Sequence, residues 1–220
     1  MFLSLSDGTR HSLIMLTFVI LPLVTLLLTT GGLADENDIE DRYSIQNQCL
    51  EALQQQINEE LQASLVYLNM AAHFQHSSIA RKGFFKFFES QSDEEKKHAH
   101  KLIAYMNKRG GRTTSFNIVT PKKSVWQTAE EAVRDAIELE KDLNIKLHNV
   151  HKNAERLCAD PHLMDFIETE FLEEQISSIR ELTKIHTVLT SFEKENRAMG
   201  EYLVDQQLLK EETRQYFDEL

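Results

Sequence analysis

Apolar residues recur every three or four positions over most of this chain, a spacing that predicts long amphipathic helices. Four such stretches lie between Leu50 and Leu189. Their apolar positions are Leu50, Leu53, Ile57, Leu61, Leu68 and Ala71; Phe84, Phe88, Leu102 and Tyr105; Ala129, Val133, Ala136, Leu143, Leu147 and Val150; and Phe171, Leu182 and Leu189. With only 7 glycines and 3 prolines in 220 residues, a turn-rich β fold or a Gly-rich nucleotide fold is excluded. The pattern predicts an all-α fold.

Residues that favour helix ends separate the four stretches. Ser77-Ser78 divides the first from the second, and Gly110-Gly111 ends the second. Thr128-x-x-Glu131 matches a capping box that opens the third, and Asp160-Pro161 supplies an N-cap and a first-turn proline for the fourth. We expect the fourth helix to end between residues 193 and 198, and a short fifth to run from about 199 to 209.

The connection between the second and third helices is long. It runs from Gly111 to Gln127 and contains Pro121. An extended segment of this length crosses a 30-residue helix at roughly 3.3 Å per residue, so the second and third helices are expected to be parallel. The predicted architecture is a four-helix bundle with a long crossover.

Each stripe becomes polar near its middle. The residues concerned are Glu60, Tyr67, Glu95, His98, Glu140 and Gln175. A single glutamate on a helix face is usually solvated, but buried carboxylates without a counter-ion cost several kcal/mol each, and no lysine or arginine lies on these stripes. We therefore expect a multivalent cation between the helices.

The donor types suggest which cation binds. Glu95-x-x-His98 places a carboxylate and an imidazole one turn apart, a spacing found in di-iron carboxylate bundles. The other helices carry no second Glu-x-x-His. Carboxylates with one imidazole suit iron or manganese better than copper or structural zinc. The sequence predicts an asymmetric dinuclear carboxylate site.

The charge is strongly acidic and unevenly distributed. The 35 acidic and 24 basic residues give a net charge of −11, and Asp7 and Arg10 cancel within the first 34 residues. Residues 35–220 therefore carry the whole excess. Such a surface repels nucleic acid and anionic lipid and attracts cations.

The first 34 residues are typical of a cleaved secretory signal peptide. An apolar run from Leu13 to Leu28 follows Arg10, and Gly32 and Ala34 provide small residues before a cleavage site at Asp35. The alternative is an uncleaved membrane anchor, since the run approaches the roughly 20 residues that span a bilayer. We expect a mature chain of residues 35–220, without membrane insertion after cleavage. It would be secreted, or retained in the secretory lumen if the terminal Phe-Asp-Glu-Leu acts like Lys-Asp-Glu-Leu.

Several segments closely resemble the ferritin heavy chain. They are INEELQASLVYLNMAAHF (57–74), SDEEKKHAHKL (92–102), KRGGR (108–112), LEKDLN (139–144) and DPHLMDFIETEFLEEQISSIREL (160–182). The resemblance covers roughly residues 44–205 and implies a ferritin-like bundle that stores iron and acts as a ferroxidase. It is similar to the secreted or vacuolar ferritins of animals.

The resemblance also assigns roles to the polar residues. Glu60, Glu95 and His98 would hold the first iron, and Glu95 would bridge to a second iron held by Glu140. Gln175 would lie near the second iron, and Tyr67 would hydrogen-bond beside the centre. Two Fe²⁺ ions would bind, dioxygen would oxidise them, and Fe³⁺ would pass to a mineral core.

A shell of 24 subunits is implied as well. Asp165 and Glu168 match the carboxylates of the family's threefold pore, and His151 matches a nearby pore histidine. The apolar and amide residues of the fifth helix that match the fourfold face are Met199, Leu203 and Gln207. Lys97 and His100 stand where the family has acids of the mineral-nucleating surface, although Glu94 is acidic, so a mixed shell with a light-type subunit is expected.

The two cysteines, Cys49 and Cys158, form neither a CxxC pair nor a disulfide framework. If Glu60 and Glu140 lie at one level on antiparallel helices, a rise of about 1.5 Å per residue puts the cysteines roughly 10 Å apart along the bundle. That separation exceeds the limit of about 7 Å for bonded Cα atoms, so an intrachain bond would require the third helix to unwind. We expect an intersubunit bond through Cys49, with two free thiols as the alternative.

Two other functions compete with the ferroxidase. One is a shell subunit that carries or nucleates iron without oxidising it, which the complete set of candidate ligands argues against. The other is a secreted helical signalling protein whose acidic stripe positions are merely solvated. Loss of rapid Fe²⁺ oxidation on substitution of the candidate ligands would separate the three.

Overall fold

The computed structural model describes residues 43–218, with side chains as far as residue 210. The predicted signal peptide, residues 1–34, lies outside this range, as do the last two residues. Every regular element within residues 43–218 is helical. None of these helices combines the length and the apolar character needed to cross a membrane.

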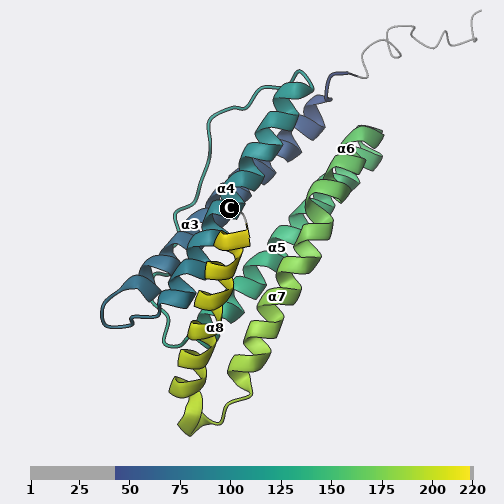
Figure 1. The fold of residues 1–220 in the computed structure, drawn as a ribbon. Helices are drawn as coiled ribbons and strands as arrows, with labels where there is room; N and C mark the ends of the chain where they lie inside the picture. The colour runs from purple at the N-terminus through teal and green to yellow at the C-terminus, as the bar shows by residue number, and fades with distance from the viewer. Residues whose placement is uncertain (1–42, 219–220) are drawn as a thin grey trace, which may run out of the picture. The chain divides into compact units, whose positions relative to one another are not determined.

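Four long helical segments form the bundle (Figure 1). They are α3 (Asn47–Gln75), α4 (Lys82–Lys108), α5 (Ala129–Arg156), and a fourth made of α6 (Pro161–Ile167), a π-helical turn η1 (Glu168–Leu172) and α7 (Glu173–Thr190). Helix α3 packs on α4 and α5, and α5 also packs on the fourth segment. The predicted four-helix bundle is confirmed.

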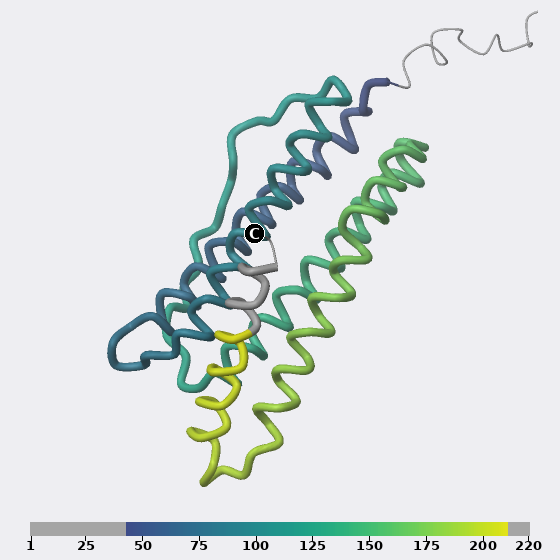
Figure 2. The backbone as a smooth tube through the Cα atoms, viewed as in Figure 1, coloured from purple at the N-terminus to yellow at the C-terminus, as the bar shows by residue number. Residues whose placement is uncertain are grey.

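The crossover loop lies along α3, and α4 and α5 run in the same direction (Figures 1 and 2). Polar side chains spaced four residues apart on α3 accept hydrogen bonds from the loop backbone. The pairs are Gln54 with Thr114 N (2.8 Å), Asn58 with Asn117 N (3.3 Å) and Gln62 with Val119 N (3.2 Å). These side chains replace the ladder partners that an extended segment lacks, so the loop follows one face of the helix.

The predicted helix boundaries are largely confirmed. Gly110, which follows the C-cap residue of α4, has a φ of +74°, a conformation that glycine adopts without strain. Thr128 accepts from Glu131 N at 3.1 Å at the start of α5, and Asp160 accepts from Leu163 N at 3.0 Å before Pro161. The fourth segment ends at Thr190, earlier than expected, and its π turn was not predicted.

The cysteine prediction is wrong: Cys49 and Cys158 form an intrachain disulfide with their Cα atoms 6.5 Å apart. The spacing argument extended the third helix through Cys158, whereas α5 ends at Arg156. Ala159 adopts a φ of +46°, and Asp160 N donates to Ala154 O at 2.9 Å, so the chain turns back beyond the helix end. This turn, which spacing along a straight helix does not describe, brings Cys158 to the start of α3.

A buried ion pair lies close to the disulfide in sequence and joins three segments. Arg109, at the end of α4, contacts Asp160 at 2.8 Å, and both side chains are almost fully buried. Arg109 Nε also donates to Tyr43 O at 2.7 Å. The segment that precedes α3, the end of α4 and the start of α6 are thus held together by charge-assisted hydrogen bonds as well as by the disulfide.

Helix α8 (Arg197–Asp218) follows a 3₁₀ turn, η2 (Lys194–Asn196), and is longer than the predicted segment 199–209. Two of its acids hold it against the bundle. Asp205 is 2% exposed and accepts from Gly83 N at 2.7 Å and Phe84 N at 3.0 Å. Glu201 accepts from Ala129 N at 3.0 Å. These acids cap the N-termini of α4 and α5, where carboxylates are favourable.

We expect Asp205→Ala to destabilise the protein by about 1–3 kcal/mol, because two buried N–H groups lose their acceptor. Urea unfolding monitored by circular dichroism would measure the loss. Asp205→Asn is the matched control, since its amide oxygen can still accept a hydrogen bond and should preserve part of the stability. A midpoint for Asp205→Ala equal to that of the wild type would contradict this role.

The buried core is divided into two apolar clusters. One contains Cys49, Leu53, Leu102, Leu147 and Leu163, and the other contains Phe74, Phe84, Phe88, Val133 and Leu182. Most predicted stripe positions are buried in these clusters or at their edges, but Leu68 is 51% exposed. The buried acids Glu60, Glu95 and Glu140 belong to neither cluster and form a polar layer in the bundle.

Candidate metal centre

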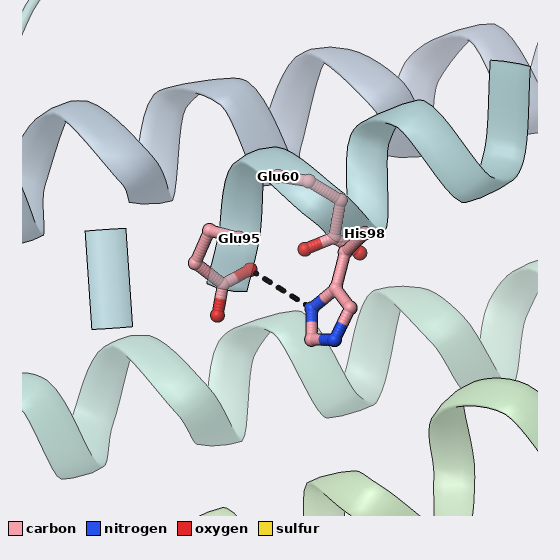
Figure 3. A group of neighbouring side chains, drawn as sticks. All are labelled: Glu60, Glu95 and His98. Carbon is pink, nitrogen blue, oxygen red and sulfur yellow. Dashed lines mark hydrogen bonds and ion pairs between the residues drawn. The ribbon is translucent and has the colours of Figure 1, made fainter. Parts of the chain in front are cut away.

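Glu60 on α3 and Glu95 and His98 on α4 form a compact cluster in this polar layer (Figure 3). One potential ligand atom from each residue lies within 4.8 Å of the other two. Glu95 Oε2 and His98 Nδ1 are 3.4 Å apart, as one helical turn allows. All three residues are buried. Two carboxylates and an imidazole are thus arranged to hold one metal ion.

A pair of serines sets the register of α3 against α4 beside this cluster. Ser64 Oγ donates to Ser92 O at 2.7 Å, and Ser92 Oγ donates to Ser64 O at 2.8 Å. Ser64 lies one turn after Glu60, and Ser92 lies one turn before Glu95. Because the hydroxyls are small and reciprocally bonded, the two helices approach closely and bring the glutamates to one level.

Glu140 on α5 supplies a third buried carboxylate, and each of its two carboxylate oxygens accepts a hydrogen bond. Tyr67 Oη donates to Glu140 Oε1, and Gln175 Nε2 donates to Oε2. Gln175 Nε2 also lies 3.0 Å from the Glu140 main-chain oxygen. One residue from each of α3 and α7 therefore orients this carboxylate.

Glu95 lies between the other two acids and interacts electrostatically with both. Burial, followed by the charge of Glu140, raises the pKa of Glu95 well above its ordinary value. Burial and the neighbouring Glu95 raise the pKa of Glu60 in the same way. Burial also raises the pKa of Glu140, although the hydrogen bonds from Tyr67 and Gln175 oppose this shift. Three mutually repelling carboxylates in one apolar bundle favour a cation of high charge.

Within the described residues, the ion pairs of the cluster involve His98 and no lysine or arginine. The structure thus brings together the six residues expected from the sequence: Glu60, Tyr67, Glu95, His98, Glu140 and Gln175. Glu95 is the member of this set that interacts with both Glu60 and Glu140.

Sequence reasoning missed Glu174, which lies directly before Gln175 on α7. Its Oε2 is 3.1 Å from His98 Nε2, so the imidazole is held between Glu174 and Glu95. Burial lowers the pKa of His98, but the hydrogen bond to Glu174 and the surrounding acids outweigh it and raise the pKa. A donor hydrogen bond from Nε2 leaves Nδ1 facing Glu95, the usual second-sphere arrangement of a metal-binding histidine. Glu174 is half-buried and lies outside the apolar stripe, which is why periodicity did not reveal it.

The residues expected near the mineral surface differ in their surroundings. Lys97 and His100 are exposed, whereas Glu94 is partly buried. Burial and the adjacent Glu174 raise the pKa of Glu94. Two further acids, Glu94 and Glu174, thus lie beside the buried cluster, whereas the exposed positions Lys97 and His100 carry no acid.

The three predicted pore residues lie at the junction of α5, α6 and the π turn. His151 Nε2 is 2.6 Å from Glu168 Oε1, and Glu168 is the first residue of that turn. Asp165 lies one turn earlier on α6 and is exposed. Asp165 and Glu168 are exposed and His151 is partly exposed, so all three reach the surface.

Comparisons with known proteins agree with this geometry. A family model described as a ferritin-like domain matches residues 50–192. Soma ferritin of Lymnaea stagnalis is 42% identical over 160 residues, covering 71% of this chain and 88% of that protein. The ferritin middle subunit of Salmo salar is 39% identical over 174 residues, covering 79% and 97%. The ferritin-1 heavy chain of Schistosoma mansoni is 38% identical over 173 residues, covering 79% and 98%.

Proposed function

Because the chain belongs to the ferritin family, whose members store iron, we propose that it is a ferroxidase subunit that oxidises Fe²⁺ with dioxygen and sequesters Fe³⁺. The observation that carries the proposal is the buried cluster of three carboxylates and one histidine, which has no lysine or arginine counter-ion among the residues that the structure describes. An iron-carrying subunit without catalysis needs no such cluster in its core. A solvated acidic surface would leave these carboxylates exposed.

Each residue of the cluster has a role in this proposal. Glu60, Glu95 and His98 bind the first ferrous ion, and Glu95 and Glu140 bind the second, with Gln175 beside it. Tyr67 orients Glu140 through its hydrogen bond. Both ions are substrates, and dioxygen accepts their electrons. Hard carboxylate ligands stabilise Fe³⁺ over Fe²⁺ and so favour the oxidation.

Assembly into a shell of 24 ferritin subunits forms part of the proposal. Met199 and Leu203 of α8 are 60% and 51% exposed, which supports burial of this face against further subunits. Asp165, Glu168 and His151 would line a threefold pore and concentrate Fe²⁺ through their negative potential. The exposed Lys97 and His100 support a mixed shell in which a light-type partner nucleates the mineral.

We propose that the chain enters the secretory pathway and begins at Asp35 after cleavage. The Cys49–Cys158 disulfide supports an oxidising compartment. Intact-mass measurement of secreted protein would detect any residues retained before Asp35. Deleting the final Phe-Asp-Glu-Leu would distinguish retention from secretion, since release should increase only if these residues act as a retention signal.

Stopped-flow oxidation of Fe²⁺ by the purified oligomer tests the catalytic proposal. The wild type should show a fast phase that saturates at two ferrous ions per subunit. His98→Ala should slow this phase by at least about 100-fold, because ligand loss exceeds the 10–100-fold effects typical of second-sphere changes. His100→Ala, an exposed histidine on the same helix, should retain it. Equal slow rates in all three proteins would rule out the ferroxidase function.

A further inference from the structure

Gln56 is a buried amide that none of the roles above uses. It lies on α3 one turn before Glu60 and is 1% exposed. Its Nε2 donates a hydrogen bond of 2.8 Å to Glu60 Oε1. A long polar side chain is rarely buried so completely, and its bonded partner is a candidate iron ligand.

This bond constrains how Glu60 can approach an ion. A glutamate has three side-chain torsions, and an amide donor fixed to one oxygen selects the rotamer of the whole carboxylate. The donated bond also lowers the pKa of Glu60, against the larger opposite effect of burial. Glu140 has two such partners, Tyr67 and Gln175. Glu60 has its amide partner on its own helix.

Gln56 lies beside a groove whose lining does not include Glu60, and Glu60 is itself 1% exposed. Gln56 lines this groove, of about 180 Å³ between α3 and α5, together with Gln55, Glu59 and Lys146. Lys146 pairs with Glu59 at 2.8 Å across the two helices. Gln56 thus contributes to the wall of this groove while its amide Nε2 is bonded to the carboxylate of Glu60. A side chain without a donor at this position would leave Glu60 free to turn.

We propose that Gln56 is a positioning residue for the first iron site: it holds Glu60 in the orientation that binds Fe²⁺ together with Glu95 and His98. This inference rests on the proposed ferroxidase function. It assigns to Gln56 an effect on the first site alone, because the second site is built on Glu95 and Glu140. Oriented ligands bind metal more tightly, and loss of a second-sphere hydrogen bond typically weakens binding 10–100-fold.

Titration of the assembled protein with Co²⁺ tests the proposal. In buffer without dioxygen Co²⁺ is not oxidised, so the titration measures binding alone. Gln56→Met has a similar volume but no donor. We expect one of the two Co²⁺ equivalents to bind 10–100-fold more weakly, with a changed visible absorption spectrum for that equivalent, while the other keeps its affinity. Gln55→Met is the matched control, because Gln55 is exposed on the same helix and lines the same groove.

A second variant, Gln56→Asn, keeps the amide but shortens its reach by one methylene, and should weaken the same equivalent. Wild-type affinity and spectrum in both Gln56 variants would overturn the inference, as would equal weakening of both equivalents. If the wild type itself binds no Co²⁺ and shows no fast phase of Fe²⁺ oxidation, the proposed function fails instead. The two failures are therefore distinguishable.

Discussion

Replacing Glu95 by glutamine is expected to lower the initial rate of Fe²⁺ oxidation by at least about 100-fold, so that the fast phase is lost. The reason is its central position. Glu95 interacts with Glu60 on one side and with Glu140 on the other, so its substitution weakens both ion positions. A neutral amide is also a much poorer ligand for iron than a carboxylate. Stopped-flow absorbance of the ferric product measures the effect.

The same substitution should stabilise the metal-free protein at neutral pH. The pKa of Glu95 is raised well above 4.5 in the folded chain, so the folded state binds its proton more tightly than the unfolded state does. Unfolding free energy therefore falls as the pH rises from about 4.5 through the folded pKa. Glu95→Gln has no such proton to lose, so its thermal midpoint should decline less over this range.

Asp93→Asn provides a matched control, because Asp93 is an exposed acid on the same helix. It should leave both the fast phase and the pH dependence unchanged. Each kcal/mol of stabilisation corresponds to a rise of roughly 2–4 °C in the thermal midpoint for a chain of this size. A metal-free Glu95→Gln protein less stable than the wild type at pH 7 would contradict the assignment of a buried, unfavourable carboxylate.

Loss of the Cys49–Cys158 disulfide is expected to have the largest effect on stability. The bond closes a loop between residues 109 apart. Removing such a constraint increases the entropy of the unfolded chain, at a cost of roughly 3–5 kcal/mol in stability. Urea unfolding of a Cys49→Ser, Cys158→Ser double variant, at the protein concentration used for the oxidised wild type, measures this cost.

Reduced wild-type protein serves as the control. It should unfold at the same urea concentration as the double variant. Its helices and its fast phase of iron oxidation should persist under mild conditions, since neither cysteine belongs to the buried acid cluster. Alkylation of the non-reduced protein under denaturing conditions should label no thiol. A labelled pair of thiols, or a covalent dimer on a non-reducing gel, would contradict the intrachain bond.

Much of the candidate site could be predicted from the sequence, because a polar residue on an apolar stripe conflicts with its neighbours. Glu60, Glu95 and Glu140 stood out for this reason, and the structure buries all three. Glu174 and Gln56 did not stand out. Glu174 lies at the edge of its helix face, and Gln56 is one of three consecutive glutamines with no pattern to separate it from Gln55.

The sequence by itself determined the four long helices, the capped starts of the third and fourth, and the polar layer, since hydrophobic periodicity and capping act over a few residues. The tertiary structure alone decided which distant residues meet. A turn beyond α5 joins Cys158 to Cys49, and a buried Asp205 caps α4 from 121 residues away. These contacts depend on where a helix stops and how its ends pack. Such three-dimensional relations leave no periodic signal along the chain.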